Sequence, residues 1–127
     1  MATRLILIAV GGSLGALARY AVSTWYIHRI PAGTLLVNVV GCLLIGLFMG
    51  AAIERHWLSH NARLFFVTGF LGALTTFSTF GWETFSLAEK KDFVLAFTNV
   101  ALHLVLGLAA VAAGFQLGVL TAPRAGT

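Results

Sequence analysis

The sequence has few charged residues: Asp, Glu, Lys and Arg make up only 9% of its 127 residues. A soluble domain carries about 25% charged residues, and so few charges cannot cover the surface of a globule this small. Hydrophobic residues instead make up 59% of the chain, and its mean hydropathy is +0.95. The composition therefore argues against a soluble enzyme.

Cysteine is nearly absent, and the motifs of common catalytic sites are missing. The single cysteine, Cys42, lies inside an apolar run, which excludes an intrachain disulfide and a cysteine-based metal site. There is no glycine-rich phosphate loop, no H-E-x-x-H and no G-x-S-x-G motif. The net charge of +4 comes from eight scattered Lys and Arg residues that form no basic stripe. We therefore expect neither an enzyme nor a nucleic-acid partner, but cationic loops at a membrane surface.

Long apolar segments are what the sequence does contain. Four of them cover residues 5–26, 32–53, 64–83 and 93–119. A bilayer core about 30 Å thick requires about 20 helical residues, so each segment is long enough to cross it. The segments lack the alternating pattern of a membrane β-barrel. We therefore predict an all-α membrane protein, residues 1–127 forming a single four-helix transmembrane domain with short connections.

The positive charges that flank these segments are balanced between the two sides of the membrane. One side receives Arg4, Arg55, Arg63 and Arg124, and the other receives Arg19, Arg29, Lys90 and Lys91. An excess of Lys and Arg normally sets the orientation, so this balance predicts insertion in both directions, unless other factors fix one. Two oppositely inserted copies would form an antiparallel homodimer with a two-fold axis in the membrane plane.

The third segment is unusually rich in glycine and hydroxyl residues. Three glycines and four Ser or Thr residues fall between Gly69 and Gly81. Both residue types weaken a helix, which favours a break near residues 72–76. Broken helices at membrane depth occur where they are buried in protein or line a cavity, and their free carbonyls and N–H groups can face a cation and an anion, respectively. The alternative is a continuous helix whose hydroxyls bond to their own turn.

Two phenylalanines in this segment are candidates for an ion path. Phe77 and Phe80 are three residues apart and would share a helix face, an arrangement that usually belongs to a core. Thr76, Ser78 and Thr79, however, place hydroxyl donors beside the rings. Since a phenyl ring has a positive edge, this surface suits a small anion, and without a buried cation it would release that anion readily.

Few other polar residues lie at membrane depth. Asn38 in the second segment can bond a neighbouring helix or donate to an anion, and Thr34 lies one turn earlier on the same face. Arg19 is either an interfacial anchor or a vestibule charge that attracts anions. Asn99 and His103 are four residues apart, so they either pair or line a polar track, and they are too few for a zinc site.

Three strings in the chain resemble the Fluc (CrcB-type) fluoride channels. Residues 72–80, GALTTFSTF, resemble the signature of this family. Residues 33–41, GTLLVNVVG, and residues 11–20, GGSLGALARY, resemble its second and first helices. The resemblance covers almost the whole chain, and the string in the third segment is highly specific.

The resemblance implies a passive fluoride channel in the cell membrane, in a bacterium the inner membrane, that exports fluoride and relieves its toxicity. It implies a dual-topology antiparallel homodimer surrounded by lipid, with two fluoride pathways and crossing broken helices. The backbone carbonyls of Gly72 and Thr75 from both copies would hold a structural Na⁺, which would shape the local field. The ion pathway would contain Asn38, Thr76, Phe77, Ser78, Thr79 and Phe80, and we expect Arg19 and Thr34 to line or support a vestibule.

Two other functions are compatible with a chain of this size. A small multidrug-type proton-coupled exporter fits the length and span count, but it requires an acidic residue within the first helix, and no Asp or Glu precedes Glu54. A non-transporting subunit of a larger complex also fits, although it does not account for the polar residues in the third segment.

Overall fold

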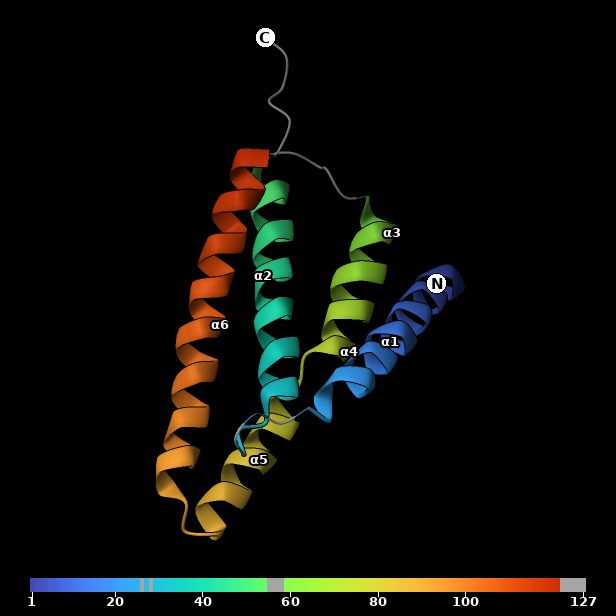
Figure 1. Ribbon diagram of the computed structural model, residues 1–127. Helices are drawn as coiled ribbons and strands as arrows, with labels where there is room; N and C mark the ends of the chain where they lie inside the picture. The colour runs from blue at the N-terminus through green and yellow to red at the C-terminus, as the bar shows by residue number, and fades with distance from the viewer. Residues whose placement is uncertain (26, 28, 55–58, 122–127) are drawn as a thin grey trace.

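The computed structural model describes residues 1–25, 27, 29–54 and 59–121, and it places almost all of them in helices (Figure 1). Tyr26, Arg55 and Arg124, which the sequence analysis used, lie outside this part of the chain. The elements are α1 (Ala2–Ser23), α2 (Ala32–Glu54), α3 (His60–Arg63), the π-helix η1 (Leu64–Leu71), α4 (Gly72–Leu74), α5 (Phe77–Glu89) and α6 (Phe93–Thr121). The described residues contain no strand, which confirms the predicted all-α fold.

Four helical stretches are long and apolar enough to cross a membrane: Ala2–Ser23, Ala32–Ala52, His60–Glu89 and Phe93–Thr121. The third of these combines α3, η1, α4 and α5. The chain is therefore a multi-pass membrane protein, as predicted. The third stretch continues to Glu89, beyond the residue 83 expected from the sequence, because Glu83 finds a hydrogen-bond donor inside the protein and α5 does not have to end there.

The third transmembrane helix is broken at two residues. Thr75, with φ −82° and ψ 152°, and Thr76, with φ −151° and ψ 117°, have extended backbones between α4 and α5. Figure 1 shows α3, η1 and α4 as one rod, after which α5 leaves in a new direction toward the start of α6. The break confirms the prediction made from the glycine and hydroxyl content of residues 72–76.

Helices α2 and α6 lie side by side over most of their length (Figure 1). Their contact is formed by glycines, because a Cβ atom on Gly114 would overlap the carbonyl of Leu43, and one on Gly46 would overlap the carbonyl of Val111. Backbones that approach this closely gain many dispersion contacts without any large side chain. The pairs Gly46/Gly50 and Gly114/Gly118, each four residues apart, are therefore packing sites.

Helix α1 packs in the same way against the first half of the broken helix. A Cβ atom on Gly11 would overlap the carbonyl of Phe65, and one on Gly15 would overlap that of Phe70. The second half, α5, instead packs against α6. Each half of the broken helix thus has its own packing partner, which allows the chain direction to change between them.

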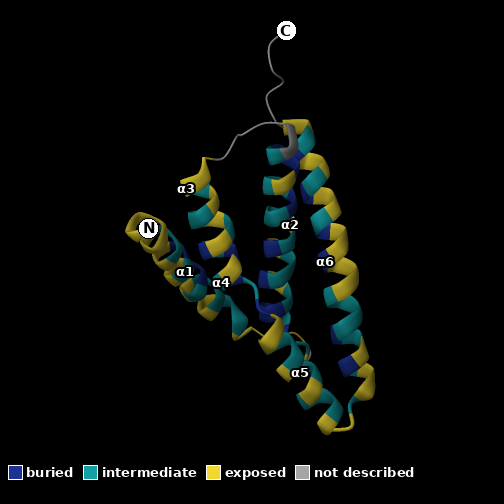
Figure 2. Cartoon of the chain, turned by 180° about the vertical axis from the view of Figure 1, so that it is seen from behind, coloured by how far each residue is buried: buried dark blue, intermediate teal, exposed yellow. Residues whose placement is uncertain are grey.

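Burial follows the lines along which helices meet. Figure 2 shows dark blue residues along these lines and yellow or teal residues over the outer faces. Large apolar side chains are exposed on every long helix, including Leu17, Phe77 and Phe97 with 65%, 82% and 74% of their surface exposed. In a bilayer such faces meet either lipid or another protein chain.

We predict that Gly114→Ala lowers the stability of the folded protein by roughly 1–3 kcal/mol, because the new methyl group forces α2 and α6 apart. Gly107→Ala is the matched control on the same helix, since its Cβ would meet only the sulfur of Cys42, at 3.6 Å. Thermal unfolding in detergent, followed by size-exclusion chromatography, measures both. Equal midpoints for the two variants would contradict the backbone contact.

Candidate functional site

A hollow of about 470 Å³ lies beside the break in the third helix. It brings together residues from α2, η1, the break, α5 and α6. Its walls contain the predicted residues Asn38, Gly72, Thr75, Thr76, Phe77 and Phe80, together with Gly41, Cys42, Ile45, Val67, Leu71, His103 and Leu104. Six residues singled out from the sequence therefore surround one space, and none of the lining residues is a Lys, Arg, Asp or Glu.

Asn38 holds the break in place from the neighbouring helix. Its Oδ1 accepts a hydrogen bond of 2.8 Å from the Thr76 N–H, and its Nδ2 donates one of 3.1 Å to the Thr76 carbonyl. One side chain thus satisfies both backbone groups of an extended residue that has left the helix. The amide carries a second N–H, for which the described residues provide no acceptor.

The Thr76 hydroxyl begins α5 as its N-terminal cap. Its Oγ1 accepts a 3.2 Å hydrogen bond from the Thr79 N–H and donates a 3.0 Å bond to the Thr79 hydroxyl. The hydroxyl of Ser78 lies 3.3 Å away. Thr76 is buried and Ser78 is exposed. The three predicted hydroxyl residues therefore form one cluster at the start of α5, although only Thr76 lines the hollow.

The break also removes the usual donors from backbone carbonyls at the end of the first half of the helix, including those of Gly72 and Thr75. In a continuous helix the Thr76 N–H would donate to the Gly72 carbonyl, and the Thr79 N–H would donate to the Thr75 carbonyl. Here the first donates to Asn38 and the second to the Thr76 hydroxyl. The carbonyls of Gly72 and Thr75 thus lose these helical partners, and unwound carbonyls of this kind are suitable ligands for Na⁺.

Aromatic rings form one wall of the hollow. The ring centroids of Phe77 and Phe80 are 5.5 Å apart with an interplanar angle of 59°, and Phe77 is 82% exposed. The ring of His103 also lies against Phe80, with a centroid distance of 4.4 Å. The pair predicted from the sequence is therefore not buried in a core within this chain.

Glu83 lies inside the protein, although the sequence suggested that it ends the third span. Its Oε1 accepts a 2.6 Å hydrogen bond from the hydroxyl of Thr34, whose side chain is fully buried. Thr34 and Asn38 share one face of α2, as predicted, and they contact the broken helix at Glu83 and Thr76. Sequence spacing on α2 identified the two donors, but it could not identify Glu83 as an acceptor.

Asn99 and His103 do not pair through their side chains. The Nδ2 of Asn99, which is fully buried, donates a 2.9 Å hydrogen bond to the hydroxyl of Thr84 on α5. The Nδ1 of His103 lies 2.9 Å from the backbone carbonyl of Asn99. Of the two, only His103 lines the hollow beside the break.

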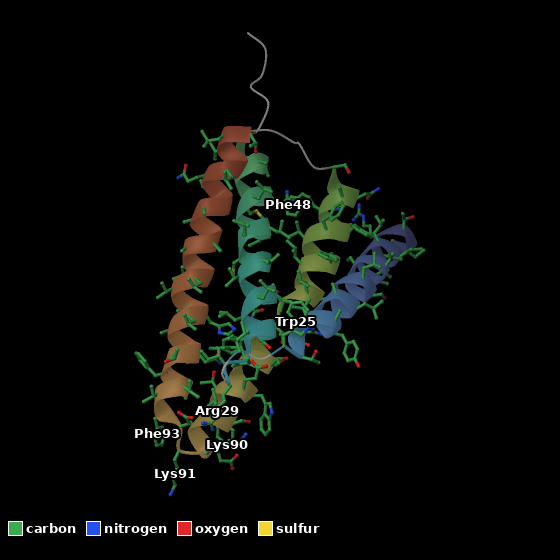
Figure 3. The ribbon with its side chains drawn as sticks, in the orientation of Figure 1. Trp25, Arg29, Phe48, Lys90, Lys91 and Phe93 are labelled. Carbon is green, nitrogen blue, oxygen red and sulfur yellow. The ribbon has the colours of Figure 1, made fainter. Side chains whose placement is uncertain are left out.

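Positive charge gathers where α5 turns into α6. Figure 3 shows Arg29, Lys90 and Lys91 close to this end of the molecule. A second hollow, of about 380 Å³, lies there between Arg29, Lys90 and the carboxylate-bearing Glu83. Arg29 forms a 3.4 Å ion pair with Asp92. Cationic side chains beside such a hollow attract anions. The sequence alone did not assign Arg29 or Lys90 to a site.

Arg19 is half-exposed in the last part of α1 and is not among the residues that line either hollow. Within this chain it neither contributes to the space beside the break nor forms an ion pair with another described residue. Its expected role at a vestibule stays a prediction.

Known proteins are similar to this sequence over most of its length. The family profile described as "CrcB-like protein, Camphor Resistance (CrcB)" matches residues 6–115. A protein of Desulfotalea psychrophila named "Fluoride-specific ion channel FluC" is 45% identical over 114 residues, which cover 87% of this chain and 88% of that protein. Proteins with the same name from Geobacter metallireducens and Thermococcus kodakarensis are 43% and 42% identical, and the matches cover 95% and 91% of their lengths. The residues matched by the family profile include the break in the third helix and every residue that lines the hollow beside it. The chain therefore belongs to the CrcB family.

Proposed function

We propose that this chain is a passive, fluoride-selective ion channel of the cell membrane, which lets fluoride leave the cell and so relieves its toxicity. The observation that carries the proposal is the hollow beside the break, where phenyl rings, an amide and a hydroxyl converge with no Lys or Arg among the lining residues. The relatives named above are called fluoride-specific ion channels, and this supports the same ion. The activity is transport and not catalysis.

The chemistry of the lining suits a small, strongly hydrated anion. Fluoride must exchange part of its hydration shell for protein donors, and here these are the free N–H of the Asn38 amide and the positive edges of Phe77 and Phe80. The Thr76 cluster adds hydroxyl donors at the N-terminus of α5, where the helix dipole is positive. Each of these groups binds weakly, so the ion is able to leave again.

We propose further that the working unit is an antiparallel homodimer with two pathways. Phe77, the most exposed large apolar side chain of α5, belongs to the wall of the hollow, so a second copy would complete the enclosure that one chain leaves open. The balance of Lys and Arg between the two membrane sides supports the opposite orientations. The central position of the broken helices in such a dimer follows from the family resemblance.

A structural Na⁺ between the two copies fits the donors at the break. The carbonyls of Gly72 and Thr75 are among those whose helical N–H partners are lost at the break, and both residues line the hollow. Oxygen ligands of this kind suit a hard cation. When bound, the ion would supply positive charge near the pathway without a permanently charged side chain.

The proton-coupled exporter considered from the sequence is not supported. The relatives compared above carry the name of an ion channel. Glu83 is an acidic side chain within the third span, but its Oε1 is bonded to Thr34 and it is not part of the hollow beside the break. A non-transporting subunit of a larger complex would show no activity alone. Transport by the purified chain alone therefore distinguishes the channel from such a subunit.

Liposomes that contain the purified chain are expected to release fluoride rapidly and to retain chloride. The liposomes are loaded with one halide, potassium gradients with valinomycin set the voltage, and ion-selective electrodes follow the efflux. Equal release of both ions would refute a fluoride-selective channel, and no release of either would refute transport by this chain alone.

Phe80→Ile is expected to slow fluoride efflux by roughly two- to tenfold, since an edge contact with an aromatic ring is worth about 0.5–1.5 kcal/mol. Phe97→Ile is the matched control, because Phe97 is 74% exposed on α6 and lies outside the hollow. If the Phe80 variant showed wild-type flux at equal protein per liposome, the Phe80 ring would have no role in the pathway.

Asn38→Ala is expected to reduce both fluoride flux and thermal stability. It leaves the N–H and carbonyl of Thr76 without their partners, and an unsatisfied buried group costs about 1–3 kcal/mol. Val40→Ala, which shortens a partly exposed side chain on the same helix, provides the control for α2. Unfolding and efflux are measured on the same preparations, and a variant with both values unchanged would show that Asn38 does not hold the break.

Dual orientation is tested with a single cysteine at the start of α1, by Ala2→Cys in a Cys42→Ser background. If both orientations coexist, a membrane-impermeant thiol reagent added to intact cells labels about half of the copies. Permeabilised cells provide the control, in which all copies react. Labelling of all copies or of none in intact cells would establish a single orientation.

A further inference from the structure

His103 is a titratable side chain in the wall of the ion path that the proposed function leaves without a role. It lies in the middle of α6, which contains no other titratable side chain between Phe93 and Thr121. Its ring faces Phe80 at a centroid distance of 4.4 Å, and it lines the hollow together with Asn38 and Thr76.

The hydrogen bond of His103 determines which ring nitrogen carries the proton. Its Nδ1 lies 2.9 Å from the carbonyl oxygen of Asn99. Because a carbonyl can only accept, Nδ1 must be the donor, and in the neutral ring Nε2 then carries a lone pair. This Nε2 is buried and has no hydrogen-bond partner among the described residues. The neutral form therefore leaves an unpaired acceptor within the wall of the hollow, as far as the described residues show, and its lone pair repels an anion.

The groups around His103 offer little compensation for a proton on Nε2. From α2, Cys42 lines the same hollow. α5 carries two titratable groups. Glu89 is exposed at its end, and Glu83, whose Oε1 accepts from Thr34, lines the second hollow instead. The residues of η1 and α4 that line the space are Val67, Leu71 and Gly72, which do not titrate. An imidazolium here would gain a cation–π contact with Phe80, but it would have no carboxylate partner in the hollow.

We infer that His103 is a proton-dependent fluoride ligand of this channel, an inference that rests on the proposed function. With Nε2 unprotonated, the ring opposes an anion beside Phe80. With Nε2 protonated, the same ring offers an N–H donor and a positive charge that only an incoming anion can neutralise. One proton taken up from water at Nε2 therefore accompanies the binding of one fluoride; the Nε2–H bond that forms is the only covalent change, and it breaks when the proton returns to water.

The sign of the pH effect follows from linkage. Binding of the proton strengthens binding of fluoride, and by reciprocity fluoride favours the protonated ring. Because acidification favours the protonated ring, fluoride binds more tightly at low pH than at high pH. The half-saturating fluoride concentration should therefore fall on acidification, by about fivefold or more if the coupling lies in the usual range.

The test measures initial fluoride efflux against fluoride concentration in liposomes at about pH 5.5 and about pH 8, with the same pH on both sides and the efflux from protein-free liposomes subtracted. Wild type should show the fall in half-saturating concentration. His103→Gln, whose amide keeps a neutral donor at any pH, should show the same value at both. His60→Gln, at the exposed start of α3, is the matched control and should behave as wild type.

The outcomes separate this inference from the proposed function. Selective fluoride efflux whose half-saturating concentration is unchanged by pH, or a shift that persists in the His103 variant, overturns the role of His103 and leaves the channel intact. Absence of fluoride efflux from wild type at both pH values overturns the channel itself, and the inference with it.

A second measurement does not depend on any variant folding. Nitrogen NMR of the histidine-labelled wild-type protein reports the protonation of each ring. Added fluoride, but not added chloride, should shift the midpoint of one histidine toward higher pH, and the signal should be that of a ring with a protonated Nδ1 in the neutral state. Midpoints that fluoride leaves unchanged would contradict the coupling.

Discussion

The two hydrogen bonds between Asn38 and Thr76 are the constraint on which the rest of the site depends. A helix broken within a bilayer leaves backbone groups without partners, and no water is present to replace them. Asn38 supplies a donor and an acceptor to the same residue, so the break is satisfied from outside the helix. As a result α5 can begin with Phe77, and the rings face a hollow and not the preceding turn.

Packing supports the break from both sides. Glycines in α1 bring it against the first half of the broken helix, while α5 rests on α6. Thr34 adds a second bond from α2 to α5, at Glu83. The carbonyls of Gly72 and Thr75 are left to other partners because their usual N–H donors are engaged elsewhere. Carbonyls without helical partners and a helix N-terminus beside the hollow therefore arise from one local change in the backbone.

Most of this fold is predictable from the sequence because membrane helices are selected by length and hydropathy. The four spans follow from length and hydropathy. Composition alone left open whether residues 72–76 break the third helix, and the family resemblance pointed to the break. The environment of Glu83 was not predictable, since it depends on a fully buried threonine in another helix. The role of His103 was hidden for a similar reason: the spacing to Asn99 was visible, but the bond is to its backbone carbonyl, which no side-chain pattern encodes.

The glycine contact between α2 and α6 has a consequence for how the lining can change. Because Gly46 and Gly114 let the two backbones interlock, α6 cannot slide or rotate relative to α2 without a clash. The position of residue 103 along the hollow that it shares with Asn38 is thus set by main-chain atoms several turns away. Its side chain can be exchanged while the scaffold stays fixed, so the chemistry that meets the ion is separable from the architecture that presents it.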